Sequence, residues 1–348
     1  DGSHMLEQNE ASDLPLSPAS FTVWPMPSFL IRAIRFAAAA LAILPLTLLA
    51  EEALQPEKVA DGVYAFIGEA GEISAANRGF VGNSGFIVGR SGVTVIDTGT
   101  SWRHGRRMLE AIARITDKPV DLVIVTHAVQ EFLFGNAAFA ERGITILAHR
   151  ETTKLMKARC EHCLQNLKPI LGEELEGTRL VLPQREIDAT TTIDAGGRRL
   201  ELIYLGWAST PGDLAVFDRD SGVLFAGGLV SVGRIPDIRD SDFEGWQRAL
   251  RRLEGLKPAR VVPGYGPVSG PGAISQTAGY LDALDQVIRS LYAESSSLME
   301  SVEKAVLPAY RDWSMVGTTH RQNALHRYLQ LELQDLGGDP RSTALPQR

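Results

Sequence analysis

The residues best suited to catalysis or metal binding are a histidine and a glutamate that follow an expected buried strand. Residues 120–125 form an apolar run typical of such a strand, and His127 and Glu131 come directly after it. A loop between a strand and a helix is a common place for ligands in α/β proteins. The imidazole could act as a base or a metal ligand, and the carboxylate could orient it. The neighbouring side chains of Val129 and Phe132 carry no lone pair.

Three further positions, Ser209, Gly228 and Tyr265, also lie at the ends of apolar, strand-like runs. We expect strands at residues 61–67, 83–89, 92–97, 120–125, 144–148, 199–205, 215–218 and 223–229. We expect helices at 103–114, 149–167, 243–256, from 273 onward, at 298–307 and at 323–331. Since strands and helices alternate, the pattern predicts a layered α/β protein.

Four short motifs carry a resemblance to a known family. Residues 126–132, THAVQEF, align with the pattern T-H-x-H-x-D-H, and residues 206–214, GWASTPGDL, align with G-x-x-H-T-x-G-D-L. Residues 224–228, LFAGG, align with L-F-A-G-D, and residues 261–267, VVPGYGP, align with V-V-P-G-H-G-P. These four motifs, in this order and spacing, resemble the metallo-β-lactamase superfamily. The resemblance covers about residues 59–334 and implies a four-layer αββα sandwich with the site at one edge of its two sheets.

In that family the motifs supply the ligands of a dinuclear zinc site. In this chain His127 is unchanged, and the other ligand positions hold Val129, Glu131, Phe132, Ser209, Gly228 and Tyr265. One histidine and one carboxylate fall short of the three protein ligands typical of catalytic zinc. We therefore expect no zinc cofactor and no hydrolysis by the family mechanism, so that the protein would be a pseudoenzyme.

Asp97 ends the expected strand 92–97. In the family the matching aspartate lies beneath the metal and orients a ligand. A carboxylate that caps a turn or a helix explains Asp97 equally well if no metal is present.

The run 71–79 and the helical C-terminal part resemble one periplasmic branch of the superfamily, the quinoprotein relay system metallohydrolases. Members of this branch accompany quinoprotein alcohol dehydrogenases and c-type cytochromes. The resemblance implies an accessory role in a quinoprotein (PQQ)-linked oxidation system, with such a dehydrogenase or cytochrome as a partner.

Three functions follow from these residues. The first is a binding or accessory protein whose cleft holds a small organic ligand, with aromatic walls at Phe132, Trp207 and Tyr265 and polar anchors at His127, Glu131 and Ser209. The second is a metal-free hydrolase that uses Ser209 as nucleophile, His127 as base and Glu131 as orienter. The G-x-S-x-G pattern of a nucleophile elbow is absent around Ser209. The third, a residual metallohydrolase with metal on His127 and Glu131, has the weakest ligand count.

The composition is that of a globular protein, with 44% hydrophobic and 22% charged residues in 348. The net charge is −7, and basic residues cluster only in short pairs such as Arg106-Arg107. Nucleic-acid binding needs a basic patch, so that class is set aside. We expect one domain over residues 51–335, with a flexible tail at 336–348.

The N-terminal region has the pattern of an export signal. Residues 1–5 contain an expression-tag remnant, and residues 6–50 form an N-terminal extension that ends in an apolar run, 36–50, preceded by Arg32 and Arg35. A run of this length with a small residue at its end is typical of a cleaved signal peptide. We expect export to the periplasm, with membrane contact only through this segment if it is not cleaved.

The two cysteines, Cys160 and Cys163, are spaced C-x-x-C on an expected helix. A disulfide between them is plausible in an oxidising compartment. A redox role would need a lowered thiol pKa, which a sequence does not reveal.

Overall fold

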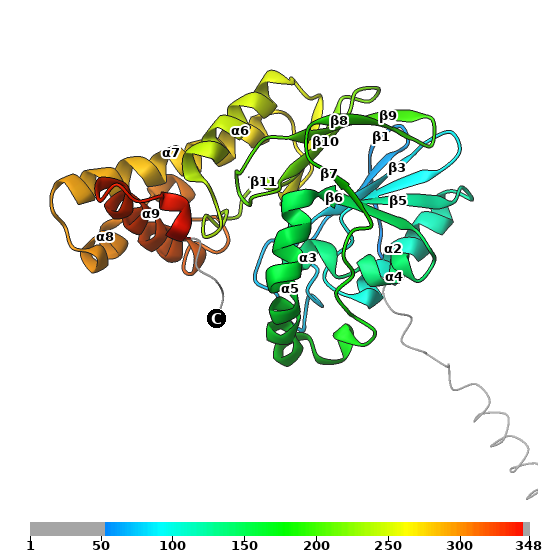
Figure 1. Ribbon diagram of the computed structural model, residues 1–348, viewed down its shortest axis with the longest axis horizontal. Helices are drawn as coiled ribbons and strands as arrows, with labels where there is room; N and C mark the ends of the chain where they lie inside the picture. Colours follow the sequence, from blue (N-terminus) through cyan, green and yellow to red (C-terminus); the bar gives the residue numbers. More distant parts are fainter. Residues whose placement is uncertain (1–52, 344–348) are drawn as a thin grey trace, which may run out of the picture. The chain divides into compact units, whose positions relative to one another are not determined.

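The first of two sheets is built from strands in the N-terminal half of the chain (Figure 1). The computed structural model describes residues 53–343. The seven strands lie in sequence order as β1 (Glu57–Ala60), β2 (Val63–Phe66), β3 (Ser84–Val88), β4 (Val93–Ile96), β5 (Val120–Val125), β6 (Thr145–His149) and β7 (Arg185–Ile187). Strands β4 to β7 run parallel to one another, and the earlier pairs are antiparallel.

The second sheet comes from the following part of the chain. It has the spatial order β12-β11-β10-β9-β8. Its strands are β8 (Thr191–Ala195), β9 (Arg198–Tyr204), β10 (Leu214–Asp218), β11 (Val223–Ser231) and β12 (Arg260–Tyr265). The pair β11–β12 is parallel and the others are antiparallel. Loops at the ends of β5, β9, β11 and β12 therefore carry the motifs singled out in the sequence.

Four layers follow from the alternation of side chains along each strand. Ile124 of β5 faces the second sheet and packs with Leu202 and Val216. Its neighbours Val123 and Val125 face the opposite way, into a core with the helices on the outer side of the first sheet. Those helices are α2 (Trp102–Ile115), α3 (Gln130–Leu133), α4 (Asn136–Ala140) and α5 (Arg150–Leu171), and the outer side of the second sheet is covered by α6 (Phe243–Gly255) and α7 (Gly272–Ala293). The expected αββα sandwich is confirmed.

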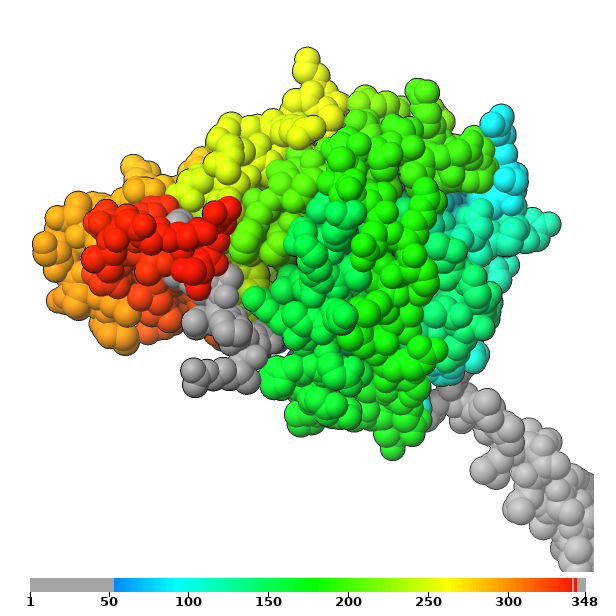
Figure 2. Space-filling model, viewed as in Figure 1, coloured from blue at the N-terminus to red at the C-terminus, as the bar shows by residue number. Residues whose placement is uncertain are grey.

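The chain after α7 folds into further helices, α8 (Leu298–Lys304) and α9 (Thr319–Asp335), that pack on α7 and on each other. They extend the core on the α6–α7 side, where Tyr280 of α7 and Ala324 of α9 are fully buried. Figure 2 shows this segment, coloured orange to red, packed as one body. The described residues belong to one compact unit that begins at Ala53.

Several elements differ from the expectation at their ends. Strands β1, β7 and β8 lie in segments with weak periodicity and were not expected, and α9 is longer than the run 323–331 suggested. A short 3-10 helix, η3 (Pro340–Thr343), lies in the segment expected to be a flexible tail. Short edge strands contain too few residues for an alternation pattern to stand out.

The expectations for the N-terminus lie outside the described residues. The tag remnant at 1–5 and the extension with its signal segment at 6–50 are not part of 53–343. Within the part of the chain that the structure describes, every helix is too short or too polar to cross a bilayer.

Candidate functional site

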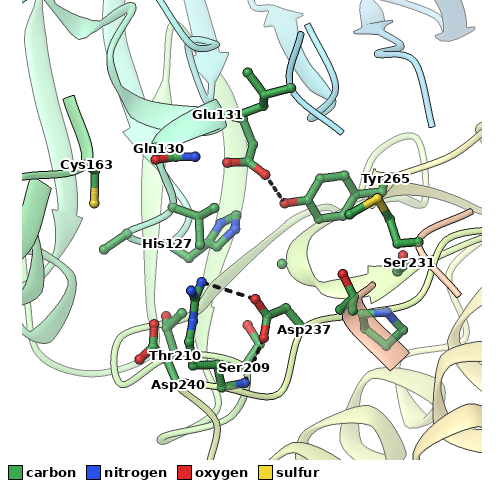
Figure 3. Close-up of a pocket in the computed structure, with 18 of the residues that line it drawn as sticks. His127, Gln130, Glu131, Cys163, Ser209, Thr210, Ser231, Asp237, Asp240 and Tyr265 are labelled. Carbon is green, nitrogen blue, oxygen red and sulfur yellow. Dashed lines mark hydrogen bonds and ion pairs between the residues drawn. The ribbon is translucent and has the colours of Figure 1, made fainter. Parts of the chain in front are cut away.

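The loops that carry the four motifs meet at one cavity of about 460 Å³ (Figure 3). The motifs define seven ligand-equivalent positions, and six of them line the cavity: His127, Val129, Glu131, Ser209, Gly228 and Tyr265. Phe132 does not line it, because its ring is fully buried behind the cavity wall with Val81 and Tyr265. Trp207, expected as an aromatic wall, is also absent from the lining and donates its indole N–H to the Asp240 carbonyl.

His127 is held by a hydrogen-bonded chain that begins at Asp97. The Asp97 carboxylate accepts hydrogen bonds from the Thr126 N–H at 2.8 Å and from the Thr126 hydroxyl at 2.7 Å. The same hydroxyl oxygen lies 2.8 Å from Nδ1 of His127. A hydroxyl has one proton, so when it donates to Asp97 its oxygen must accept from Nδ1–H of His127. Nε2 of His127 then carries the lone pair.

Burial governs the charge states of this chain. Burial lowers the pKa of His127 to about 3, so the imidazole is neutral at neutral pH. Burial also raises the pKa of Asp97 to about 7, although the hydrogen bonds from Thr126 oppose the rise. Asp97 has a left-handed backbone with φ of 57°, which an aspartate tolerates better than most residues. The sequence suggested a supporting role for Asp97, and the support reaches His127 through Thr126.

Glu131 and Tyr265, which replace two family ligands, are bonded to each other. The Tyr265 hydroxyl donates to the Glu131 carboxylate at 2.7 Å across 134 residues of sequence. Burial raises the pKa of the Tyr265 hydroxyl well above its ordinary value, so it remains a donor. The guanidinium of Arg234 lies over the Tyr265 ring, 3.9 Å from its centre. A cation–π contact of this kind fixes the ring and the guanidinium together.

Ser209 is bonded within its own loop. Its hydroxyl contacts both carboxylate oxygens of Asp213, at 2.9 and 3.0 Å. The same carboxylate also accepts from the N–H and the hydroxyl of Thr210. Burial raises the pKa of Asp213 to about 6, against the effect of these hydrogen bonds. The Asp213 carboxylate thus organises the loop that carries Ser209.

Gly228 lies where a side chain would collide with its neighbours. A Cβ atom added there would lie 2.7 Å from Cδ2 and Nε2 of His127 and 3.0 Å from the Ser209 hydroxyl. Real Cβ atoms essentially never approach other atoms this closely, so an aspartate at 228 would require His127 to move. The Phe132 ring packs on the other side of the imidazole, 4.3 Å between ring centres. The imidazole is therefore enclosed from two sides.

The residues of a Ser-His-Glu hydrolase come close together without forming a relay. Ser209 and His127 both lie next to Gly228, but Ser209 is bonded to Asp213, and Glu131 is bonded to Tyr265. Among the hydrogen bonds of residues 53–343, none joins Ser209 to His127 or His127 to Glu131. A base must reach the proton that it removes, and this arrangement does not provide that contact.

The donor set does not fit the family's dinuclear zinc. No group of three or more His, Cys, Asp and Glu side chains in the described part of the chain is placed to hold a metal ion. Val129, Phe132 and Gly228 have no donor atoms, and Glu131 is already bonded to Tyr265. Catalytic zinc sites typically use three protein ligands.

The sequence did not point to the charged residues of the cavity. Arg159 pairs with Asp240 at 2.6 Å, and Arg239 pairs with Asp237 at 3.1 Å. Arg234 lines the same cavity, is 9% exposed, and has no carboxylate within ion-pair distance among the described residues. Its Nε atom is buried without a hydrogen-bond partner. Isolated arginines on a helix or in a loop have no sequence pattern that would mark them in advance.

The C-terminal segment supplies one wall of the cavity. Met315, Thr318, Thr319 and Gln322 all line it and come from the start of α9 and the loop before it. The opposite wall is α5, through residues such as Leu155, Arg159 and Cys163.

Cys160 and Cys163 lie one turn apart on α5, and both are thiols in the structure. Cys160 is buried in the core of the first sheet, and Cys163 lines the cavity. The disulfide between them stays a prediction.

The family model for the metallo-beta-lactamase superfamily matches residues 77–265, more than half of the chain. Together with the two-sheet sandwich, this match shows that the chain belongs to the metallo-β-lactamase superfamily. The matched span ends at Tyr265, so α7, α8 and α9 lie beyond it.

Individual relatives are distant. The chain is 24% identical over 218 residues to a metallo-beta-lactamase type 2 of Bacillus sp. (strain 170), which covers 60% of this chain and 77% of that protein. It is 22% identical over 205 residues to metallo-beta-lactamase IND-1 of Chryseobacterium indologenes, and the match covers 58% of this chain and 78% of that protein.

Solved structures give the same fold. A metallo-beta-lactamase from Pontibacter korlensis matches with a TM-score of 0.55 and 22% identity, over 66% of this chain and 99% of that one. FIM-1 from Pseudomonas aeruginosa, in its mono-zinc form, matches with a TM-score of 0.53 and 18% identity, over 66% of this chain and 95% of that one. At these identities the likeness shows the fold alone.

Proposed function

We propose that this protein is a metallo-β-lactamase-fold pseudoenzyme that binds a small organic ligand in its cavity. The observation that supports the proposal is that the polar side chains at the ligand-equivalent positions bond to other residues of the protein. The polar ones at Glu131, Tyr265 and Ser209 are occupied by hydrogen bonds within the protein, while the cavity beside them keeps about 460 Å³. Without a bound metal, no low-pKa water would serve as nucleophile.

One buried arginine of the cavity, Arg234, favours an anionic ligand. Arg159 and Arg239 are each paired with an aspartate, which leaves the buried guanidinium of Arg234 without one. A buried charge is costly unless it is paired. A ligand carboxylate beside Arg234 would supply the missing partner and would accept from its unsatisfied Nε–H. The C-terminal wall at Thr318 and Gln322 adds polar contacts outside the span shared with the family.

The biological setting is an accessory role in a quinoprotein (PQQ)-linked oxidation system of the periplasm. The support is the resemblance of the run 71–79 and the helical C-terminal part to the quinoprotein relay branch. The partner is a periplasmic quinoprotein dehydrogenase or a c-type cytochrome. Co-purification of a tagged form from periplasmic extract tests this part of the proposal, and recovery of neither class of protein would contradict it.

Zinc content tests the loss of the metal site. The protein is purified without chelator, dialysed against excess zinc, desalted and analysed for metal. A restored variant, with Val129→His, Glu131→Asp, Phe132→His, Ser209→His, Gly228→Asp and Tyr265→His, is treated in parallel. We expect far less than one zinc per natural chain and tight zinc in the restored variant.

The natural chain alone decides the question if the restored variant does not fold. Stoichiometric zinc that survives desalting, and that is lost in His127→Ala, would overturn the pseudoenzyme proposal. Substoichiometric zinc that is unchanged in His127→Ala would support it.

Thermal unfolding with a set of aliphatic and aromatic carboxylates tests the ligand. A ligand at 100 times its Kd adds about 2.7 kcal/mol of stability, which raises Tm by several degrees. We expect such a shift in the natural protein and in Arg248→Leu, a surface arginine on α6, and its loss in Arg234→Leu. No shift with any carboxylate, or an equal shift in Arg234→Leu, would contradict an anion site at Arg234.

A further inference from the structure

The thiol of Cys163 is placed for chemistry that the family motifs do not involve. It lines the cavity from α5, while Cys160, one turn earlier on the same helix, is 1% exposed and packs in the core. A molecule in the cavity can therefore reach Cys163 and not Cys160. Figure 3 shows the sulfur of Cys163 on the side of the cavity opposite Tyr265.

Two neighbours favour the thiolate of Cys163. The buried Cys160 thiol donates a hydrogen bond to Cys163, and this bond, helped by the charge of Arg239, lowers the pKa of Cys163 against the effect of burial. The same hydrogen bond, with burial, raises the pKa of Cys160. Arg239 also lines the cavity, in the loop after β11. The thiolate is the nucleophile in thiol–disulfide exchange, so an accessible, low-pKa cysteine beside a second cysteine has the features of a redox pair.

We propose that Cys163 and Cys160 form a thiol–disulfide exchange site that acts on small disulfides entering the cavity, with Cys163 as the attacking thiol and Cys160 as the resolving thiol. This activity is independent of the binding function proposed above.

The chemistry balances within the pair and its substrate. The Cys163 thiolate attacks one sulfur of the small disulfide, the S–S bond breaks, and one thiolate leaves. Cys160 then loses its proton and attacks the Cys163 sulfur, which releases the second thiolate and joins Cys160 to Cys163. The two cysteines are oxidised to a disulfide, and the small disulfide is reduced to two thiols.

The helix must tighten to complete the second step. Cβ atoms three residues apart in a helix are about 5–6 Å apart. A disulfide needs about 3.5–4.5 Å between its Cβ atoms. The turn of α5 that carries the pair must therefore adjust locally, and this makes the resolving step slower than the first attack.

The test uses 5,5′-dithiobis(2-nitrobenzoate), an aromatic disulfide whose reduced half absorbs visible light. The chain has two cysteines, so each released equivalent can be assigned. We expect the reduced native protein to release a first equivalent from attack by Cys163 and then a second as Cys160 resolves it. Mass spectrometry should show a final product with no adduct.

Three variants separate the roles. Cys160→Ser should release one equivalent and keep the adduct, because the resolving thiol is gone while an O–H donor remains. Cys160→Ala should react several-fold more slowly than Cys160→Ser at neutral pH, because it lacks that donor. Cys163→Ser should release nothing while native and one equivalent after unfolding in urea.

Each opposite result overturns the proposal. Native Cys163→Ser reacting as fast as the natural protein would show that Cys163 is not the accessible thiol. An unreactive native Cys160→Ser would show that Cys163 cannot attack. A natural protein that stops at a stable mixed disulfide would remove the resolving role of Cys160.

Discussion

The two sides of the cavity differ in what their polar groups do. On the side of the first sheet, Asp97, Thr126 and His127 form a hydrogen-bonded chain that also holds the backbone, because Thr126 N–H donates to Asp97. On the side of the second sheet, Ser209 bonds only within its own loop, to Asp213, and Gly228 has no side chain.

The difference shows which parts of a metal-site scaffold have a structural role of their own. The carbonyl of Thr126 accepts from the Leu214 N–H, a bond that joins the end of β5 to the start of β10 in the other sheet. Through Thr126, Asp97 therefore supports both the contact between the two sheets and the imidazole of His127. Ser209 and Gly228 have no such second task. Three measurements test whether the two sides differ in this way.

Loss of the Thr126 hydroxyl should have the largest effect. Thr126→Val keeps the shape and the N–H bond to Asp97, but it leaves Oδ2 of Asp97 and Nδ1 of His127, both buried, without their hydrogen-bond partner. Each orphaned group costs about 1–3 kcal/mol, so we expect a loss of roughly 2–4 kcal/mol of unfolding free energy. Ser209→Ala should cost only about 1 kcal/mol, because Asp213 keeps both bonds from Thr210. Urea unfolding measures both, and equal losses would contradict the comparison.

A methyl group at Gly228 should have the next largest effect. Gly228→Ala places Cβ 2.7 Å from the His127 ring, and such overpacking typically costs about 1–3 kcal/mol. The control is Gly272→Ala at the start of α7, where an added Cβ meets nothing within 4 Å. We expect the control to be neutral or slightly stabilising in thermal unfolding. If Gly228→Ala behaves like the control, the imidazole is not enclosed as described.

The pH dependence of stability should show the smallest effect for each step that is measured, which is one pH unit. Burial raises the pKa of Asp97 to about 7 in the folded protein, whereas an unfolded aspartate titrates near its ordinary value of about 3.9. Between these values the folded state holds the proton and the unfolded state does not, so stability falls as pH rises. The stability of the natural protein relative to Asp97→Asn should therefore decrease from pH 4 to pH 7, by at most about 1.4 kcal/mol per pH unit.

Urea unfolding of both proteins at several pH values measures this difference in unfolding free energy. The contribution of histidine titration is common to both proteins and cancels in the difference. A difference that does not change with pH would show that Asp97 is ionised throughout. A difference that grows with pH would mean that hydrogen bonds from Thr126 outweigh the effect of burial.

Local apolar patterns predicted most strands and helices because they report on burial, and the resemblance of the four motifs to the superfamily predicted the αββα sandwich. Residues such as Ile124 alternate with outward-facing neighbours in β5, and the four motifs place loops at strand ends. The sequence also predicted that His127, Ser209 and Gly228 lie close together, because in the family the strands that precede these motifs end at the same edge of the two sheets. The short strands β7 and β8 were not predicted, because a few half-buried residues give no clear alternation of apolar and polar side chains.

The four motifs were enough to predict the αββα sandwich and the family, and the sequence shows directly which side chains stand at the ligand-equivalent positions. The partners of these side chains could be seen only in the folded protein: Glu131 bonds Tyr265 across 134 residues, Arg234 lies on the Tyr265 ring, and the start of α9 lines the cavity. Periodicity is a local property of one strand or helix. Contacts between loops depend on how the two sheets stack, and no pattern within a single loop records that stacking.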